Sequence, residues 1–167
     1  MRTLPMAIGI ASLAAATAPG PARADEADPP GGMRAPAAEL TGIAAAMRET
    51  FGDALHGPGA ADAERSCRTD LDGARRCEAR LGPFIISTAS GLSGVRMRAG
   101  VSRAAGTTAC AVLFAHALGI SIEDVAADAT RTFKEAWDAE GGRASTVRDG
   151  VRLQISLPDG ACITRTL

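Results

Sequence analysis

The sequence predicts a single α+β domain, with three helices packed on one face of an antiparallel sheet of hairpins that disulfides cross-link. Three observations predict this class: two consecutive helical patterns over residues 109–137, short alternating runs bounded by Asp-Gly turns, and four cysteines in a chain of 167 residues. Runs of strands and runs of helices that stay separate along a chain are typical of α+β folds.

The two central helices are expected to form the core. In the first, over residues 109–118, only His116 interrupts an apolar surface, so most sides of that helix should be buried. Gly119 separates it from a second helix, which begins at Ser121 with a variant of the capping box. The apolar residues of the second helix recur on one face: Ile122, Val125, Ala126, Ala129, Phe133, Ala136 and Trp137.

The N-terminus has the pattern of an export signal. Residues 1–24 begin with a positive end at Arg2, continue as an apolar stretch and finish in the small-x-small cleavage pattern Ala22-Arg23-Ala24. Residues 25–36 are acidic and rich in proline and glycine, and we expect a flexible linker there. Residues 37–167 then form the single domain.

Composition and charge limit which cellular compartment and which kinds of partner we expect for this protein. After removal of the signal the chain has 16 basic and 19 acidic residues, a net charge of −3, and it contains no tyrosine and one tryptophan. Nothing there favours nucleic acid, whose binding usually adds aromatic stacking platforms. No later apolar run reaches the roughly 18 residues that a membrane span needs. The sequence therefore predicts a periplasmic or secreted protein with no membrane span after signal cleavage.

An even number of cysteines in an exported chain predicts two disulfides. Cys67 and Cys77 flank the segment Leu71-Asp72-Gly73. A three-residue turn with Gly73 in the left-handed region places the two cysteines directly opposite each other, within disulfide range. The intervals between the four cysteines along the chain do not fit a zinc site, and both histidines are isolated. We therefore expect no metal and no cofactor.

Cys110 and Cys162 are left to form the second bridge, with two buried free thiols as the alternative. The last turn, Pro158-Asp159-Gly160, leaves two registers open. A two-residue turn pairs Cys162 with Leu157 and directs it to the core, which suits the bridge. A three-residue turn directs Cys162 to the polar face and buries Ile163 instead, because a slip of one residue exchanges the two faces.

The remaining elements follow from periodicity and turn residues. A first helix is expected from Ala37 to the Gly57-Pro58 stop, with an apolar face that includes Leu40, Ile43, Ala44 and Met47. Two strands are expected over residues 83–88 and 95–101, joined by a small polar loop at 89–94, and a three-stranded meander ends the chain. Residues 50–55 also resemble residues 132–137, which weakly suggests a repeated unit of a helix and a hairpin.

His116 is the best single catalytic candidate, because a titratable ring interrupts an otherwise apolar helix. The chain has no G-x-S-x-G motif, and the acidic residues at the start of the second central helix, Glu123, Asp124 and Asp128, suit the helix dipole. A hydrogen-bonded core histidine is the alternative. We therefore assign no catalytic residue.

Arginines are concentrated between residues 65 and 103, where eight of them oppose three acidic residues. On adjacent strands they would form a cationic sheet face that holds an acidic protein or an anionic envelope component. The candidate binding residues are Arg75, Arg96 and Arg98. The alternative is scattered, solvated arginines that acidic residues elsewhere balance.

The expected function is that of an exported, non-enzymatic binding or accessory protein of the bacterial cell envelope. Two alternatives remain. One is a small periplasmic hydrolase that uses His116, and the other is a structural or inhibitor-like module whose hairpin tip at residues 71–73 enters a partner.

Overall fold

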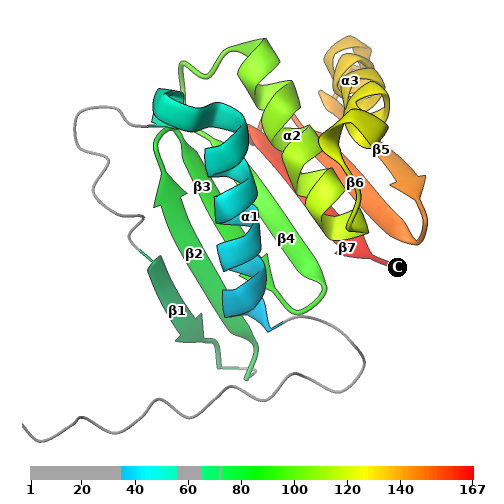
Figure 1. The fold of residues 1–167 in the computed structure, drawn as a ribbon. Coiled ribbons are helices and arrows are strands. Elements are labelled where there is room, and N and C mark those ends of the chain that lie inside the picture. Colours follow the sequence, from blue (N-terminus) through cyan, green and yellow to red (C-terminus); the bar gives the residue numbers. More distant parts are fainter. Residues whose placement is uncertain (1–34, 56–64, 72) are drawn as a thin grey trace, which may run out of the picture.

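The computed structural model describes residues 35–55, 65–71 and 73–167 (Figure 1). The expected signal peptide at 1–24, most of the expected linker and the Gly57-Pro58 stop lie outside the described residues. Of the linker, Ala35 and Pro36 are described: Ala35 is buried and Pro36 is the first residue of a helix.

Among the described residues, seven strands form one antiparallel sheet. Their order is β1-β2-β3-β4-β7-β6-β5, so an N-terminal and a C-terminal meander meet where β4 pairs with β7. The strands are β1 (Arg65–Thr69), β2 (Arg75–Leu81), β3 (Phe84–Ala89), β4 (Leu92–Met97), β5 (Arg143–Arg148), β6 (Val151–Ser156) and β7 (Ala161–Thr166).

Three α-helices cover one face of this sheet (Figure 1). They are α1 (Pro36–Phe51), followed by the 3₁₀ turn η1 (Gly52–Leu55), α2 (Arg103–Leu118) and α3 (Ile122–Asp138). Helix α1 packs over β2 and β3, α2 over β4 and β7, and α3 over β5 and β6. The predicted α+β class, with helices on one sheet face, is confirmed.

The helix ends follow local chemistry. Helix α1 begins with a proline at its first position and ends at Phe51, where Gly52 has a positive φ of 49°, so it stops before the expected Gly57. Helix α2 begins at Arg103, six residues before the expected start, because the side chain of Ser102 accepts a hydrogen bond from the backbone N–H of Ala105. The predicted cap of α3 at Ser121 is confirmed, with Oγ accepting from the N–H of Asp124 at 3.3 Å.

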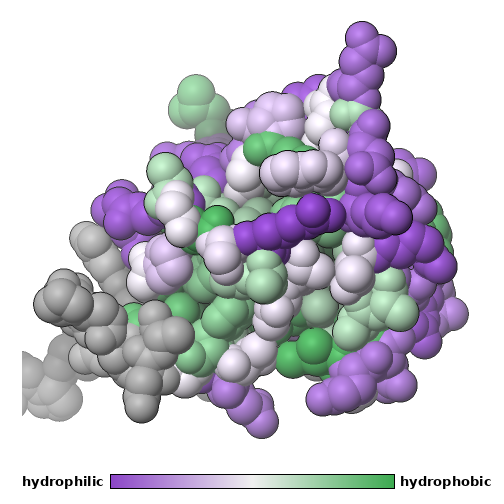
Figure 2. All heavy atoms as spheres, turned by 90° about the horizontal axis from the view of Figure 1, so that it is seen from above, coloured by the Kyte–Doolittle hydropathy of each residue, from purple (hydrophilic) through white to green (hydrophobic). Residues whose placement is uncertain are grey.

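The core lies between the helices and the sheet. Leu40, Ile43 and Met47 of α1 are fully buried, as their spacing predicted. On α3 the expected face is wrong at two positions, Ala126, which is exposed, and Trp137, which is 58 % exposed. The Trp137 ring instead lies under the guanidinium of Arg103, with Cζ 4.9 Å from the ring centroid. Seen from above, hydrophilic side chains gather along the top and right-hand margins, and paler or apolar ones fill most of the middle, which a hydrophilic band crosses (Figure 2).

The β1–β2 hairpin has the predicted register. Cys67 lies opposite Cys77 and is bonded to it, and the N–H of Asp70 donates to the carbonyl of Ala74 at 2.9 Å. Gly73 has a φ of 80°, the left-handed conformation that the three-residue turn requires.

The β3–β4 hairpin corrects the expected strand limits. β4 runs from Leu92 to Met97 rather than over 95–101, and the expected loop at 89–94 shrinks to two residues, Ser90 and Gly91. Gly91 has a φ of 66°, which permits this tight turn.

Both expected registers of the last turn are wrong. Four residues, Leu157–Gly160, connect β6 to β7, and Cys162 lies opposite Ile155. Lengthening the loop from two to four residues moves the pairing by a full side-chain period and leaves each residue of β7 on the same face. Cys162 therefore faces the core, as the two-residue turn predicted, and it is bonded there to Cys110. Ile163 consequently lies on the uncovered face of the sheet, half-buried.

The two halves of the fold have equivalent parts. A helix and a three-stranded meander recur as α1-β2-β3-β4 and α3-β5-β6-β7, and α2 lies over the junction of the two meanders. The similar segments 50–55 and 132–137 fall at the ends of the corresponding helices, α1 and α3. The expected repeat differs from this arrangement, because it matched the β1–β2 hairpin with β5–β6, whereas in the sheet β2–β3 corresponds to β5–β6 and β1 is an additional edge strand.

Candidate functional site

No described helix covers the second face of the sheet (Figure 1), hereafter called the open face. Most of the charged residues on this face are arginines. On β2 the buried Cys77, Ala79 and Leu81 alternate with exposed residues, so the exposed ones point away from the helices. Cross-strand register then assigns seven arginines to the open face: Arg68, Arg76, Arg80, Arg96, Arg143, Arg152 and Arg165. Among the described strand residues there, Glu78 is the acidic one.

These arginines occupy the two ends of the strands. Arg68, Arg76, Arg165 and Arg152 fall near one end, and Arg80, Arg96 and Arg143 near the other. The row between them is mostly small or polar: Ser66, Glu78, Ser87, Gly94, Ile163, Gln154 and Ser145.

Three of the seven arginines form an ion pair with an acidic residue of the described chain. Asp70 lies between two of them, with an ion pair to Arg76 and a longer one of 3.6 Å to Arg68. Asp159 pairs with Arg143 at 3.3 Å. The side chains of the other four form no hydrogen bond or ion pair with the described residues: Arg80, Arg96, Arg152 and Arg165. Arg96 nevertheless acts on Asp159 through its charge.

Two open-face residues, Ser156 and Arg143, favour the carboxylate form of Asp159, which lies in the loop before β7. A hydrogen bond from the Ser156 hydroxyl lowers the pKa of Asp159 below its ordinary value, and a hydrogen bond from Arg143 lowers it further. A depressed carboxyl pKa favours the folded state at pH values above the unfolded pKa, and this contribution disappears as the pH falls through the folded pKa.

The open face also has a hollow. A cavity of about 290 Å³ lies over β1 to β4. Three arginines, two hydroxyl-bearing residues and one acidic residue line it: Arg68, Arg76, Arg96, Ser66, Ser87 and Glu78. Guanidinium groups and hydroxyls are donors that suit a carboxylate or a phosphate.

The structure separates the predicted binding residues. Arg96 lies on the open face, whereas Arg75 lies opposite Thr69, on the side of the sheet where the Cys67–Cys77 bridge lies. Arg98 is exposed beyond the end of β4, and its N–H donates to the carbonyl of Pro83. Arg96 therefore shares a surface with the other open-face arginines, and Arg98 follows it by two residues along the chain.

Sequence reasoning missed the arginines of the C-terminal meander. Arg143, Arg152 and Arg165 lie outside the segment 65–103 that the charge count singled out. On β6 and β7, Arg152 and Arg165 alternate with residues that face the core, such as Leu153 and Thr164, and this alternation could have assigned them to the open face. It could not place them beside the N-terminal arginines, because that requires the pairing of β4 with β7.

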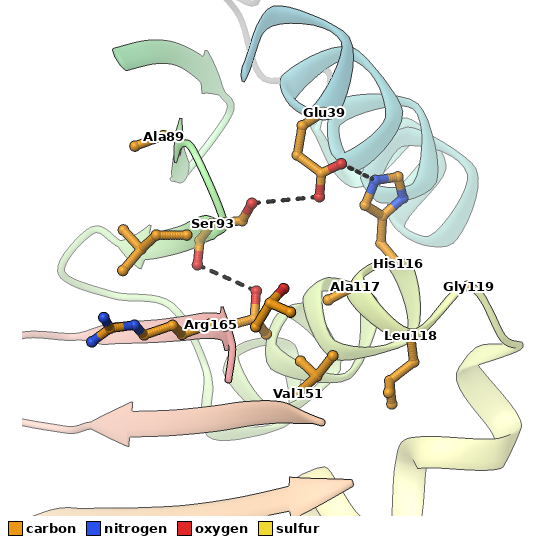
Figure 3. Close-up of a pocket in the computed structure, with 13 residues that line it drawn as sticks. Glu39, Ala89, Ser93, His116, Ala117, Leu118, Gly119, Val151 and Arg165 are labelled. Atoms are coloured by element: carbon orange, nitrogen blue, oxygen red, sulfur yellow. Dashed lines mark hydrogen bonds and ion pairs between the residues drawn. The ribbon is translucent and has the colours of Figure 1, made fainter. Parts of the chain in front are cut away.

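His116 lines a second cavity, of about 380 Å³, whose lining also includes Glu39 of α1, Ser93 of β4 and Arg165 of β7 (Figure 3). Its Nε2 lies 3.4 Å from Oε2 of Glu39, and the hydroxyl of Ser93 donates to Oε1 of Glu39 at 3.4 Å. Side chains from α1, α2 and β4 thus converge, and those of His116 and Glu39 are 13 % and 18 % exposed.

The order of these three groups does not match an activated nucleophile. A hydroxyl nucleophile needs a hydrogen bond to its base, and a third group then orients the base. Here the carboxylate of Glu39 lies between the hydroxyl of Ser93 and the imidazole of His116 (Figure 3). We therefore base no enzymatic proposal on this cavity, and hydrolysis through His116 stays an untested alternative.

The other sequence candidates have structural surroundings of their own. Leu71, at the tip of the β1–β2 hairpin, is fully exposed, so the interpretation of this tip as an inhibitor-like element stays a prediction. Glu123 and Asp124 lie in the first turn of α3, where the helix dipole favours them. Among the described residues no group of three or more His, Cys, Asp or Glu side chains is placed to hold a metal ion.

The compartment is constrained by the cysteines. All four are paired, as Cys67–Cys77 and Cys110–Cys162, and stable disulfides fit an extracellular or secreted protein. No helix in the described ranges is long and apolar enough to cross a membrane.

Comparison with known proteins adds no family. No protein-family model, no curated protein and no solved structure matches this chain, so its function is argued from the geometry of the open face.

Proposed function

We propose that the protein is an exported, non-enzymatic binding or accessory protein of the bacterial cell envelope, and that its open face binds an acidic partner. One observation carries the proposal: seven arginines share an uncovered sheet face with one acidic strand residue, and four of them lack an ion pair with the described chain.

The charge of the open face differs from that of the whole chain. The full sequence has a net charge of −1, so the cationic face is balanced by acidic residues elsewhere and not by an excess of basic residues. Such a separation attracts anionic partners to one side of the molecule and accelerates their association. Arginine suits the task because its planar guanidinium donates two parallel hydrogen bonds to one carboxylate.

Export is the second part of the proposal. The signal-like residues 1–24 and the two disulfides together favour the periplasm, where thiols are oxidised. The intact mass of the protein recovered from its host tests this part, because cleavage after Ala24 leaves Asp25 as the first residue. A recovered mass that retains residues 1–24 contradicts export by this signal.

Binding is tested with poly-L-glutamate as the acidic probe, at low salt and again at about 200 mM salt. The test variant changes the four unpaired arginines to glutamine: Arg80→Gln, Arg96→Gln, Arg152→Gln and Arg165→Gln. We expect its affinity for the probe to fall at least tenfold, since its charge-assisted hydrogen bonds to carboxylates are lost.

A matched control removes the same number of positive charges from the helices: Arg48→Gln, Arg103→Gln, Arg131→Gln and Lys134→Gln. This control should keep most of the affinity, because none of its four positions lies on a strand of the open face. Equal losses in the two variants, or no loss in either, would refute the open face as the binding surface.

A further inference from the structure

The open face contains two pairs of arginines that lie directly opposite each other on neighbouring strands. Arg68 of β1 opposes Arg76 of β2, and Arg152 of β6 opposes Arg165 of β7. Directly opposed residues have Cβ atoms about 4.5–5.5 Å apart, and like charges in that position destabilise a sheet.

The two pairs differ in how their charge is balanced. Asp70 forms ion pairs with both Arg68 and Arg76, so the first pair shares one carboxylate. Arg152 and Arg165 form no ion pair with any described residue. The same arrangement of guanidinium groups therefore exists twice on this face, once with a carboxylate and once without.

We propose that the Arg152–Arg165 pair binds carboxylates of a partner protein, and that the partner presents them on an amphipathic helix. The inference rests on the proposed function, because it names the partner chemistry of the open face. Asp70 shows, within the same chain, the group that such a pair accepts.

Apolar residues beside the pair favour a protein segment over a simple polyanion. Leu92 of β4 lies opposite Arg165, and Val147 of β5 lies opposite Arg152. Their exposed fractions are 39 % and 52 %. Leu92, Arg165, Arg152 and Val147 thus form a row across four adjacent strands, with one apolar residue on either side of the two cationic ones. This row matches a ligand with two carboxylates between two apolar side chains.

The spacing of the row favours a helix. Neighbouring strands are about 4.8 Å apart, so the four positions from Leu92 to Val147 span about 14 Å. Residues at i, i+3, i+7 and i+10 of a helix rise by about 0, 4.5, 10.5 and 15 Å. Alternate residues of an extended segment are about 6.7 Å apart and lose this register after the second position.

Two labelled peptides of identical composition test the inference. In the first, Leu, Glu, Glu and Leu occupy positions i, i+3, i+7 and i+10 of an Ala/Gln helix, and in the second the Leu and Glu positions are exchanged. We expect the wild-type protein to bind the first peptide at least tenfold more tightly by fluorescence anisotropy.

The variant Arg152→Gln/Arg165→Gln should abolish this difference in affinity, and the control variant Arg48→Gln/Lys134→Gln should retain it. Equal binding of the two peptides to wild type, or a difference that survives in Arg152→Gln/Arg165→Gln, overturns the inference.

A charge reversal at one position distinguishes a loss of binding from a loss of folding. Arg165→Glu places a carboxylate opposite Arg152, in the manner of Asp70, so its Tm should rise by about 1–4 °C while its binding of the first peptide disappears. Unchanged peptide binding by this variant overturns the inference.

Failure of the inference is distinguishable from failure of the proposed function. If the fourfold glutamine variant loses poly-L-glutamate while wild type does not discriminate the two peptides, the open face binds acids without the proposed helix register. If that variant keeps poly-L-glutamate, the proposed function itself fails.

Discussion

Replacement of Cys110 and Cys162 by alanine is expected to lower the free energy of unfolding by about 4 kcal/mol. The bridge joins residues 52 apart in the sequence, so it removes much of the conformational freedom of the unfolded chain. It also ties α2 to β7, at the point where the two meanders meet, and both cysteines are fully buried. Urea denaturation at neutral pH measures the loss directly.

The other disulfide provides the control. Cys67 and Cys77 are 10 residues apart, for which the same relation gives about 3 kcal/mol. β1 is an edge strand whose residues are all exposed, so opening it disturbs little of the core. We therefore expect Cys67→Ala/Cys77→Ala to cost less than the Cys110/Cys162 replacement. An equal or larger loss for the edge bridge would contradict this account.

Features with local causes could be predicted from the sequence. The Ser121 cap needs a hydroxyl next to the N–H groups of the first turn, and the β1–β2 register needs a glycine at position 73. Both depend on residues a few positions apart. The limits of the strands were harder to predict. The sequence around Gly91 suggested a loop of six residues, but Gly91 makes a turn tight enough for Leu92 to begin β4.

The last turn shows why non-local features escaped prediction. The cluster Pro158-Asp159-Gly160 suggested a loop of two or three residues, but the connection has four. Cys162 must reach Cys110 in the core, and this long-range demand fixes the parity of the loop and leaves Ile163 on the open face.

The candidate site was predictable in part for the same reason. An arginine-rich open face was expected from the segment that holds Arg96, and the alternation of β4 places Arg96 there. Arg152 and Arg165 join it through the pairing of β6, β7 and β4, which no local pattern shows. The partner of His116 was equally hidden, since Glu39 precedes it by 77 residues.

Gly42→Ala is expected to lower the free energy of unfolding by about 1–3 kcal/mol, although alanine is the better helix former by about 1 kcal/mol. Gly42 lies within α1, against the ring of His116. A Cβ at this position would lie 2.5 Å from Cε1 and 3.0 Å from Nε2 of that ring, closer than atoms in contact allow. The imidazole would have to leave its place beside Glu39, and thermal or urea denaturation would record the cost.

Removal of the ring should reverse the sign of this effect. In a His116→Ala background nothing of the imidazole meets the new Cβ, so Gly42→Ala should raise the stability by up to about 1 kcal/mol through helix propensity alone. The four proteins form a double-mutant cycle whose coupling energy isolates the contact between α1 and α2. If Gly42→Ala changed stability equally in both backgrounds, the ring would not be what position 42 accommodates. A reversed sign would show that glycine is kept in α1, at a cost in helix propensity, to seat His116 beside Glu39.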